Sequence, residues 1–377
     1  MGNTILKMDG ITKQFPGVLA LDKASFELTR GEVHALLGIN GAGKSTLIKV
    51  LSGINQIEGG KIWIDGKAVE IDGTTAARKL GVATVYQAPE MVPSFSGYEN
   101  VFLGNESTRS GFFSYIDRQE LRRHANEVLK QFPIDVDLDR PVSELAPIER
   151  EAVSILRALV LEDIKILILD EPTSILSHRE IQILFSLIRS LKEQGVSIIY
   201  VTHNLNEVFE ITDRFTVFRA GQNVGTFPSD KATYSHNDIA ELMLGNKLQS
   251  VYPEASESYG ETLFAIEDLA YGQVFEDVTF EVRRNEIVGI FGLVGSGLDE
   301  LCKTMFGDLR ADTGEIRIAG VPQNFRSCAD AIDAGIFLVP ADRHTEGYFS
   351  DESIAFNTTI SNLPGVSSRG IVRRKAE

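Results

Sequence analysis

The stretch Gly38–Ser45, GINGAGKS, decides the fold of this chain. It fits the pattern G-x-x-x-x-G-K-[ST], in which glycines let backbone N–H groups approach phosphates at the start of a helix. The apolar run before it, Gly31–Leu37, predicts a buried strand, and Ser45–Leu51 predicts a helix. A strand, a glycine loop and a helix in this order indicate a nucleotide site rather than an ordinary turn.

Each residue type in this loop has a chemical reason to be there. The Lys44 ammonium can reach the β and γ phosphates, and the Ser45 hydroxyl can bind Mg²⁺. We therefore predict ATP and Mg²⁺ as cofactors. The residues expected to contact the nucleotide are Gly38, Asn40, Gly41, Ala42, Gly43, Lys44, Ser45 and Thr46.

Two carboxylates end the continuous apolar run Ile164–Glu171, IKILILDE. Such a run is typical of a central parallel strand, whose C-terminal end faces a ligand crevice. We expect Asp170 to hold Mg²⁺ through water. Glu171 is expected to polarise the attacking water, because phosphoryl transfer depends on a positioned nucleophile.

Two further strands end in polar side chains. The run Val196–Val201 is followed by Thr202 and His203, and this position favours contact of His203 with the γ-phosphate. The run Val82–Tyr86 is followed by Gln87. On its own, Gln87 is an unremarkable loop amide.

The chain repeats itself at a fixed offset of 254 residues. Phe26 matches Phe280 (280 minus 26), and many glycines follow in step. The polar segment KLQSVYPEASESYGE lacks periodicity and suits an exposed linker. We predict a first domain at residues 1–247, a linker at 248–261 and a second domain at 262–377.

The second copy differs from the first in length and in its loop. Only 85 residues follow Gly292 (377 minus 292), so we expect a second domain truncated by about 125 residues. Its loop reads GLVGSGLD, with Leu298 in place of Lys44 and Asp299 in place of Ser45. A carboxylate without a lysine should bind ATP poorly. Ala341 stands where Gln87 stands in the first copy.

Length and composition narrow the class of protein. The 377 residues predict more than one domain, and 43% hydrophobic residues exclude a disordered chain. The net charge of −16 argues against nucleic acid as the main partner. No stretch approaches eighteen apolar residues and the start is not a signal peptide, so we expect a chain that stays in the cytoplasm.

Together these motifs, in this order, resemble the ATP-binding subunits of ABC transporters. The tandem copies, EPTSILS at Glu171–Ser177 and YENVFLG at Tyr98–Gly104 resemble the double-domain ATPases of bacterial ribose, xylose and galactose importers. The resemblance implies an α/β P-loop fold of ABC type, with a mostly parallel sheet, an antiparallel β subdomain and a helical subdomain at Gly97–Val160. It makes Phe15 the residue that stacks on adenine and His203 the switch histidine. It makes Gln87 a Mg²⁺ ligand and the sensor at the membrane-subunit interface.

One segment departs from the family pattern. ABC ATPases carry a Leu-Ser-Gly-Gly-Gln type signature at a helix start, and here that place reads LAPIE, Leu145–Glu149. Ala146 has no hydroxyl and Pro147 has no N–H, although proline suits the first turn of a helix. An alignment shifted to Ser143 restores a serine but not the glycines. In the family each site joins one domain's loop to the other's signature, so the altered loop at Gly292 faces the altered signature.

The resemblance implies an energy-coupling ATPase of a monosaccharide importer. Its expected partners are membrane permease subunits and, indirectly, a periplasmic or extracellular sugar-binding protein, with no nucleic acid. Its expected place is peripheral, at the cytoplasmic face of the membrane. We expect little hydrolysis by this chain alone. Two alternatives stay open: a soluble tandem ABC protein in translation or DNA repair, and a non-catalytic ATP-binding regulator.

Overall fold

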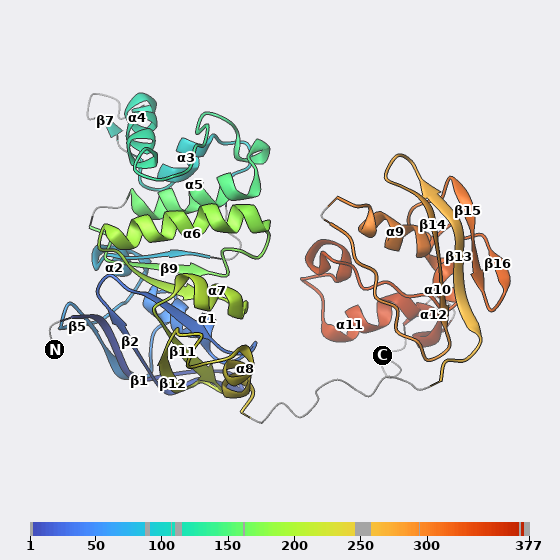
Figure 1. Ribbon diagram of the computed structural model, residues 1–377, viewed down its shortest axis with the longest axis horizontal. Helices are drawn as coiled ribbons and strands as arrows, with labels where there is room; N and C mark the ends of the chain where they lie inside the picture. Colours follow the sequence, from blue (N-terminus) through green and yellow to red (C-terminus); the bar gives the residue numbers. More distant parts are fainter. Residues whose placement is uncertain are drawn as a thin grey trace. The chain divides into compact units, whose positions relative to one another are not determined.

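The computed structural model describes residues 3–86, 91–106, 108–109, 115–160, 163–245, 258–293, 295–368 and 371–372. The chain forms two compact units, Met1–Val251 and Tyr252–Glu377, and each is described by itself (Figure 1). Most of the predicted linker, residues 248–257, lies outside the described residues, and the first strand of the second unit begins at Thr262.

A six-stranded sheet forms the centre of the first unit, in the order β12-β11-β3-β10-β9-β6. Its strands pair in parallel from β11 to β6, and only β12 is antiparallel. Continuous apolar runs form its inner strands because both faces of the sheet are covered. The strands are β3 Val33–Leu37, β6 Val82–Val85, β9 Ile166–Asp170, β10 Ser197–Val201, β11 Arg214–Arg219 and β12 Gln222–Pro228. The predicted strands are confirmed, one or two residues shorter at their ends.

An antiparallel sheet in the order β2-β1-β4-β5 carries the N-terminus of the chain. Its strands are β1 Thr4–Phe15, β2 Val18–Thr29, β4 Gly59–Ile64 and β5 Lys67–Val69. Its apolar face shares one core with the helix α1, Lys44–Leu51, and with β9 and β10. Burial alternates along β2, as expected for a sheet with one face on the core and one face exposed to solvent. The short helix α2 is Thr74–Lys79.

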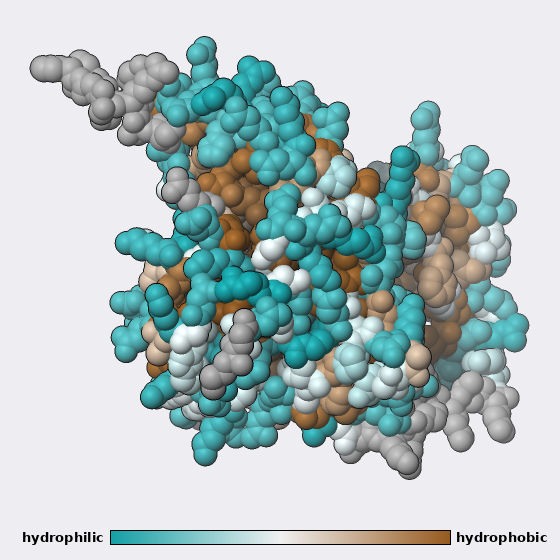
Figure 2. Space-filling view, turned by 60° about the vertical axis from the view of Figure 1, so that its left-hand side comes forward, coloured by the Kyte–Doolittle hydropathy of each residue, from teal (hydrophilic) through white to brown (hydrophobic). Residues whose placement is uncertain are grey.

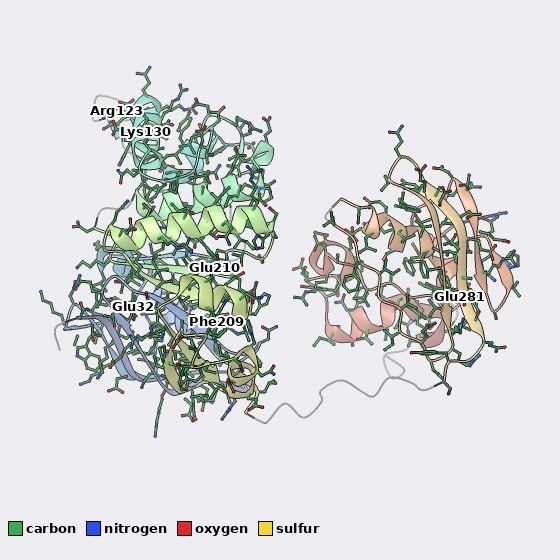
Figure 3. The ribbon with its side chains drawn as sticks, viewed as in Figure 1. Glu32, Arg123, Lys130, Phe209, Glu210 and Glu281 are labelled. Atoms are coloured by element: carbon green, nitrogen blue, oxygen red, sulfur yellow. The ribbon has the colours of Figure 1, made fainter. Side chains whose placement is uncertain are left out.

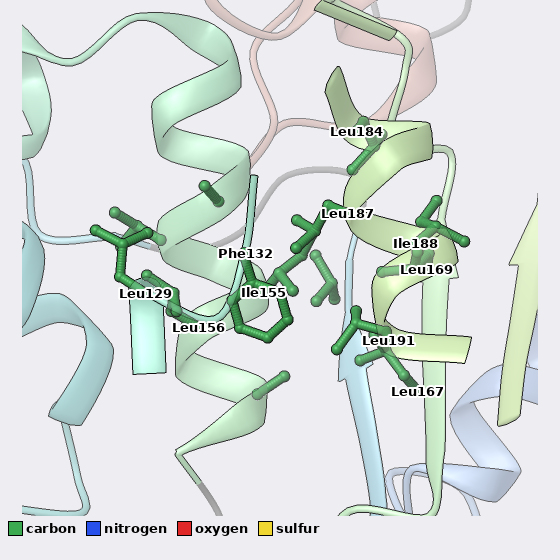
Figure 4. Packing of buried hydrophobic residues seen from close by; sticks show 14 of the residues in the cluster. Leu129, Phe132, Ile155, Leu156, Leu167, Leu169, Leu184, Leu187, Ile188 and Leu191 are labelled. Atoms are coloured by element: carbon green, nitrogen blue, oxygen red, sulfur yellow. The ribbon is translucent and has the colours of Figure 1, made fainter. Parts of the chain in front are cut away.

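Helices cover the other face of the parallel sheet (Figure 1). Ile155 and Leu156 of α5 and Leu187 of α6 belong to one core with Leu167 and Leu169 of β9 (Figure 4). The expected helical subdomain contains α3 Gly97–Phe102, the strand pair β7 Thr108–Arg109 and β8 Tyr115–Ile116, α4 Arg118–Leu129, η1 Val142–Glu144 and α5 Pro147–Leu159. The remaining helices are α6 His178–Glu193, α7 Leu205–Ile211 and α8 His236–Leu244.

The second unit repeats the antiparallel sheet, in the order β14-β13-β15-β16. The strands are β13 Thr262–Tyr271, β14 Phe275–Arg283, β15 Thr313–Ile318 and β16 Val321–Gln323. Helix α9, Leu298–Met305, corresponds to α1, and α10, Cys328–Asp333, corresponds to α2. The other elements are η2 Arg343–Gly347, α11 Ile354–Thr359, η3 Ile360–Asn362, α12 Leu363–Val366, β17 Ser367–Ser368 and β18 Ile371–Val372.

The parallel sheet is not repeated in the described part of the second unit. Residues 287–291 and 336–339, the counterparts of β3 and β6, form no strand. Ile287 is 94% exposed and Phe291 is 97% exposed, whereas β3 is wholly buried between β10 and β11. Apolar side chains therefore reach the surface of this unit, and Figure 2 shows brown apolar groups on its visible side. Among the described helices, none has the length and apolar composition needed to cross a bilayer.

Candidate nucleotide site

The loop between β3 and α1 requires glycine at two positions, Gly38 and Gly43. Gly43 has a left-handed φ of 103° at the start of α1, and a Cβ there would lie 2.7 Å from the Ala20 carbonyl oxygen. A Cβ on Gly38 would lie 2.4 Å from the Phe218 carbonyl oxygen. The loop is thus held between β2 and β11, with the N–H groups of the first turn of α1 available to an anion.

Lys44 is buried at the start of α1. Its Nζ donates hydrogen bonds to the carbonyl oxygens of Gly38, at 2.6 Å, and Ile39, at 3.1 Å. Burial lowers the pKa of the ammonium, while the carboxylates of Glu171 and Asp170 act in the opposite direction. The structure therefore brings Lys44 beside the predicted acid pair. Ser45 is exposed and Thr46 half-buried in the same turn.

The acid pair lies at the C-terminal end of β9, as predicted. Asp170 is the last residue of the strand, and burial and the charge of Glu171 raise its pKa, against Lys44 and Lys49. Glu171 has a positive φ of 51°, and its N–H donates to the Val201 carbonyl at 3.0 Å. A non-glycine residue in this region is strained, and such strain concentrates at functional sites.

His203 contacts Glu171 directly. The Nδ1 of His203 lies 3.3 Å from Oε1 of Glu171, and the imidazole is 71% exposed while the carboxyl is 20% exposed. Parallel pairing of β9 with β10 places the two strand ends together, with Val201 opposite Asp170. The strand-end histidine and the predicted general base thus share one site.

Phe15 lies at the end of β1, next to the turn that leads to β2. It pairs with Val18 across the turn to β2, the strand that brings Ala20 against Gly43. Its ring is 38% exposed, and Nζ of Lys13 lies 5.4 Å from the ring centroid. An exposed ring here can stack on a base. Gln87, assigned to catalysis and to Mg²⁺, lies outside the described residues.

The altered signature segment forms a helix start without a hydroxyl. Helix α5 begins at Pro147, and the Ala146 N–H donates to the Glu149 carboxylate at 2.6 Å. Ser143 lies in the separate turn η1, four residues before Pro147. The alternative alignment therefore does not place a serine at this helix start.

The second loop starts its helix at a glycine of positive φ, as the first does, but lacks the chemistry of the first. Gly297 starts α9 with φ 83°, as Gly43 starts α1 with φ 103°. The first turn of α9 carries Asp299 and Glu300, whereas that of α1 carries no acid. Leu298 supplies no ammonium. Negative side chains at a helix N-terminus compete with a bound anion for the same N–H groups.

Sequence reasoning missed Glu207, which lies in α7 only four residues after His203. This carboxylate is 4% exposed and accepts hydrogen bonds from four side chains. The available signal was an acid in an apolar run, LNEVFEI, but a solvent-facing helix position explains such an acid equally well.

A hollow of about 770 Å³ lies between α1, β6 and the helices α3 and α5. Tyr86 and Met91, on either side of the segment that contains Gln87, both line it. The described lining includes three basic residues, Lys49, Arg78 and Arg157, and no acidic one. In a chain of net charge −16, this surface favours a partner that carries negative charge.

Comparisons with known proteins agree on one family. Residues 21–174 match the family described as ABC transporter. A ribose import ATP-binding protein, RbsA 1 of Streptomyces avermitilis, is 40% identical over 99% of this chain and 70% of its own length. An arabinose import ATP-binding protein, AraG of Vibrio parahaemolyticus, is 41% identical over 95% of this chain and 70% of its own length.

Solved structures support the fold. The cbiO1 protein of Clostridium perfringens, part of an ABC transporter complex, is 28% identical with a TM-score of 0.53, covering 64% of this chain and 96% of its own. A nucleotide-free ATP-binding cassette from an ABC transporter has a TM-score of 0.57 at 23% identity, covering 67% of this chain and all of its own. This second likeness bears on the fold alone.

Proposed function

Because the chain belongs to the family of ATP-binding proteins of ABC transporters, whose members are ATPases, we propose that it powers a monosaccharide importer. The relatives described above are named for ribose and arabinose import, and neither is named for translation or DNA repair. The observation that carries hydrolysis is the contact of Glu171 with His203 beside the buried Lys44.

The residues around the loop fit a MgATP complex. Oxygen ligands suit Mg²⁺, and Ser45 supplies a hydroxyl while Asp170 supplies a carboxylate. Burial raises the pKa of the Asp170 carboxyl group. When bound, the metal offsets charge on the β and γ phosphates. Lys44 would exchange its two carbonyl acceptors for phosphate oxygens, and the exposed Phe15 ring would stack on adenine.

Glu171 and His203 have distinct roles in this proposal. Glu171 accepts a proton from the attacking water, and its backbone, held by the Val201 carbonyl, fixes the direction of the carboxylate. His203 lies at the same edge of the sheet and donates to the γ-phosphate once nucleotide is bound.

The proposed partner is a pair of membrane permease subunits at the cytoplasmic face of the membrane, fed by a sugar-binding protein outside. The basic hollow adjoining the segment of Gln87 is the proposed permease contact. Its size and its three cations suit a helical segment that carries a carboxylate. Transport specificity would then belong to the partners, because in this proposal the permease and the binding protein, and not the ATPase, hold the sugar.

Hydrolysis is tested by Glu171→Gln. The amide is nearly isosteric but accepts no proton. Because little hydrolysis is expected of the chain alone, turnover is measured with the permease of a ribose importer present, where we expect unchanged ATP affinity and a loss of turnover of at least about 100-fold. Single-turnover assays with radiolabelled ATP and excess protein measure both quantities. Lys44→Ala provides the background rate. Turnover within twofold of the unmodified chain would exclude Glu171 as the base.

The permease contact is tested by co-purification with the permease of a ribose importer from detergent. Arg78→Glu, which reverses a charge in the hollow, should reduce the recovered complex at least about tenfold. Lys130→Glu changes an exposed cation outside the hollow and is the matched control (Figure 3). Equal recovery of the Arg78 and Lys130 variants would exclude the hollow as the contact.

A further inference from the structure

The carboxylate of Glu207 is a shared hydrogen-bond acceptor for residues close in sequence to Glu171 and His203. Its Oε2 accepts from the hydroxyls of Tyr200, at 2.9 Å, and Thr202, at 2.7 Å. Its Oε1 accepts from the hydroxyl of Thr173, at 2.8 Å, and from Nδ2 of Asn204, at 3.1 Å. Four donors on one buried carboxylate make a fully satisfied site.

The four donors come from both segments that carry the proposed catalytic pair. Thr173 lies two residues after Glu171, and Thr202 and Asn204 lie on either side of His203. A single carboxylate thus ties the turn after β9 to the turn after β10. Hydrogen bonds to an ionised acceptor are shorter and stronger than neutral ones, so this tie resists displacement of either turn.

We propose that Glu207 is a positioning residue that sets the separation of Glu171 from His203 through Thr173. The inference rests on the proposed hydrolysis at that pair. Glu171 is held at a positive φ, and a strained residue keeps its conformation only when its surroundings fix it. Small misplacements of catalytic groups cost large factors in rate, while nucleotide binding depends on the loop at Lys44.

The same helix provides a matched control. Glu210, one turn further along α7, is exposed and accepts from Nε2 of Gln182 of α6 at 2.8 Å (Figure 3). This contact also joins α7 to a neighbouring element, but it touches neither turn of the site. Loss of Glu210 therefore reports what an ordinary helix contact contributes.

The experiment uses three test variants: Glu207→Gln, Thr173→Val and the double variant that combines these two changes. Glu210→Gln is the control. Glu207→Gln and Thr173→Val should each lower single-turnover hydrolysis at least about tenfold, with the ATP dissociation constant within twofold of the unmodified chain. Thr173→Ser, which keeps the hydroxyl, should restore the rate. The double variant should lose less than the product of the single losses, because Thr173→Val removes the hydrogen bond that Glu207→Gln weakens by replacing a carboxylate acceptor with a neutral amide. Glu210→Gln should change neither quantity.

A second measurement needs no turnover. With six histidines in the chain, the imidazole resonances of His203 can be assigned by NMR from a His203→Gln spectrum. Thr173→Val should shift them in the nucleotide-free chain, and Glu210→Gln should not. Unshifted resonances, unchanged rates or multiplicative losses would overturn the role of Glu207. If the unmodified chain assayed with its permease does not exceed the Lys44→Ala background, the proposed hydrolysis fails, and the resonances still decide the positioning.

Discussion

The two copies of this chain share a scaffold but not a site. Both have a four-stranded antiparallel sheet in the same order, and both start a helix at a glycine with positive φ. Only the first places a lysine after that glycine and polar groups at the ends of adjoining parallel strands. The shape of a glycine loop therefore does not make a nucleotide site, which needs the charges that neighbouring strands bring to it.

A pair of corresponding glutamates shows how tertiary contacts differ between the two copies. Glu32 and Glu286 occupy the same turn and accept a backbone N–H from Thr29, at 2.6 Å, and Arg283, at 2.7 Å. Only Glu32 also contacts His34, at 3.1 Å, and Arg214, at 2.7 Å. Position 288, the counterpart of His34, is a valine. One turn serves a buried charge network in the first copy and remains at the surface in the second.

The largest expected difference between the two copies is in how much Glu32 and its counterpart Glu286 contribute to the free energy of unfolding. Burial raises the pKa of Glu32, but hydrogen bonds from His34, Arg214 and Thr29 outweigh it and lower the pKa to about 2. Because its pKa is lower in the folded state, Glu32 stabilises the fold at pH values above its unfolded pKa of 4.5. This contribution is lost as the pH falls from 4.5 toward 2. Glu32→Gln should cost about 3 kcal/mol at pH 7 and remove this part of the acid dependence.

The control is Glu286→Gln, which should change stability by less than about 0.5 kcal/mol. Trp63, the one tryptophan of the chain, lies in β4, so its fluorescence in urea follows the first unit alone. Scanning calorimetry records both units, and the transition that Trp63 fluorescence does not report is assigned to the second. Equal costs for the two variants would contradict the assigned difference between the turns.

A smaller difference is expected in nucleotide affinity. Lys44→Ala removes a charge-assisted contact to phosphate and should weaken ATP binding by about 1.5 to 3 kcal/mol, roughly 10-fold to 150-fold. Leu298→Ala, at the same place in the second loop, should leave affinity unchanged. Titration calorimetry with MgATP measures both. A loss on changing Leu298 would mean that the second loop binds nucleotide after all.

The smallest effect should be the same in both copies. Gly66 and Gly320 have φ of 74° and 78°, and a Cβ at either would meet no atom within 4 Å. Alanine at each position should therefore cost only the backbone strain, about 1 kcal/mol. Trp63 fluorescence should report the loss for Gly66→Ala and calorimetry that for Gly320→Ala. Unequal losses would show that the hairpins β4–β5 and β15–β16 do not contribute equally to the stability of their units.

Local patterns in the sequence were enough to predict the loop and the strands that carry the proposed site. The loop at Gly38–Ser45, the strand ending at Asp170 and the strand ending before His203 all appear where their residues predict. Each depends on a short stretch: glycines that permit one backbone, or an apolar run that ends in a polar residue. The helix start at Pro147 was expected from the family resemblance and from the fit of proline to the first turn of a helix.

Tertiary structure alone decided which of these groups meet. The contact of His203 with Glu171, the four bonds to Glu207 and the burial of Glu32 against Arg214 join residues from separate strands and helices. The second copy makes the same point, because Ile287 and Phe291 match the buried Val33 and Leu37 of β3 at the 254-residue offset and yet lie exposed. Strand burial depends on non-local pairing, and hydrophobic periodicity within one segment does not contain that information.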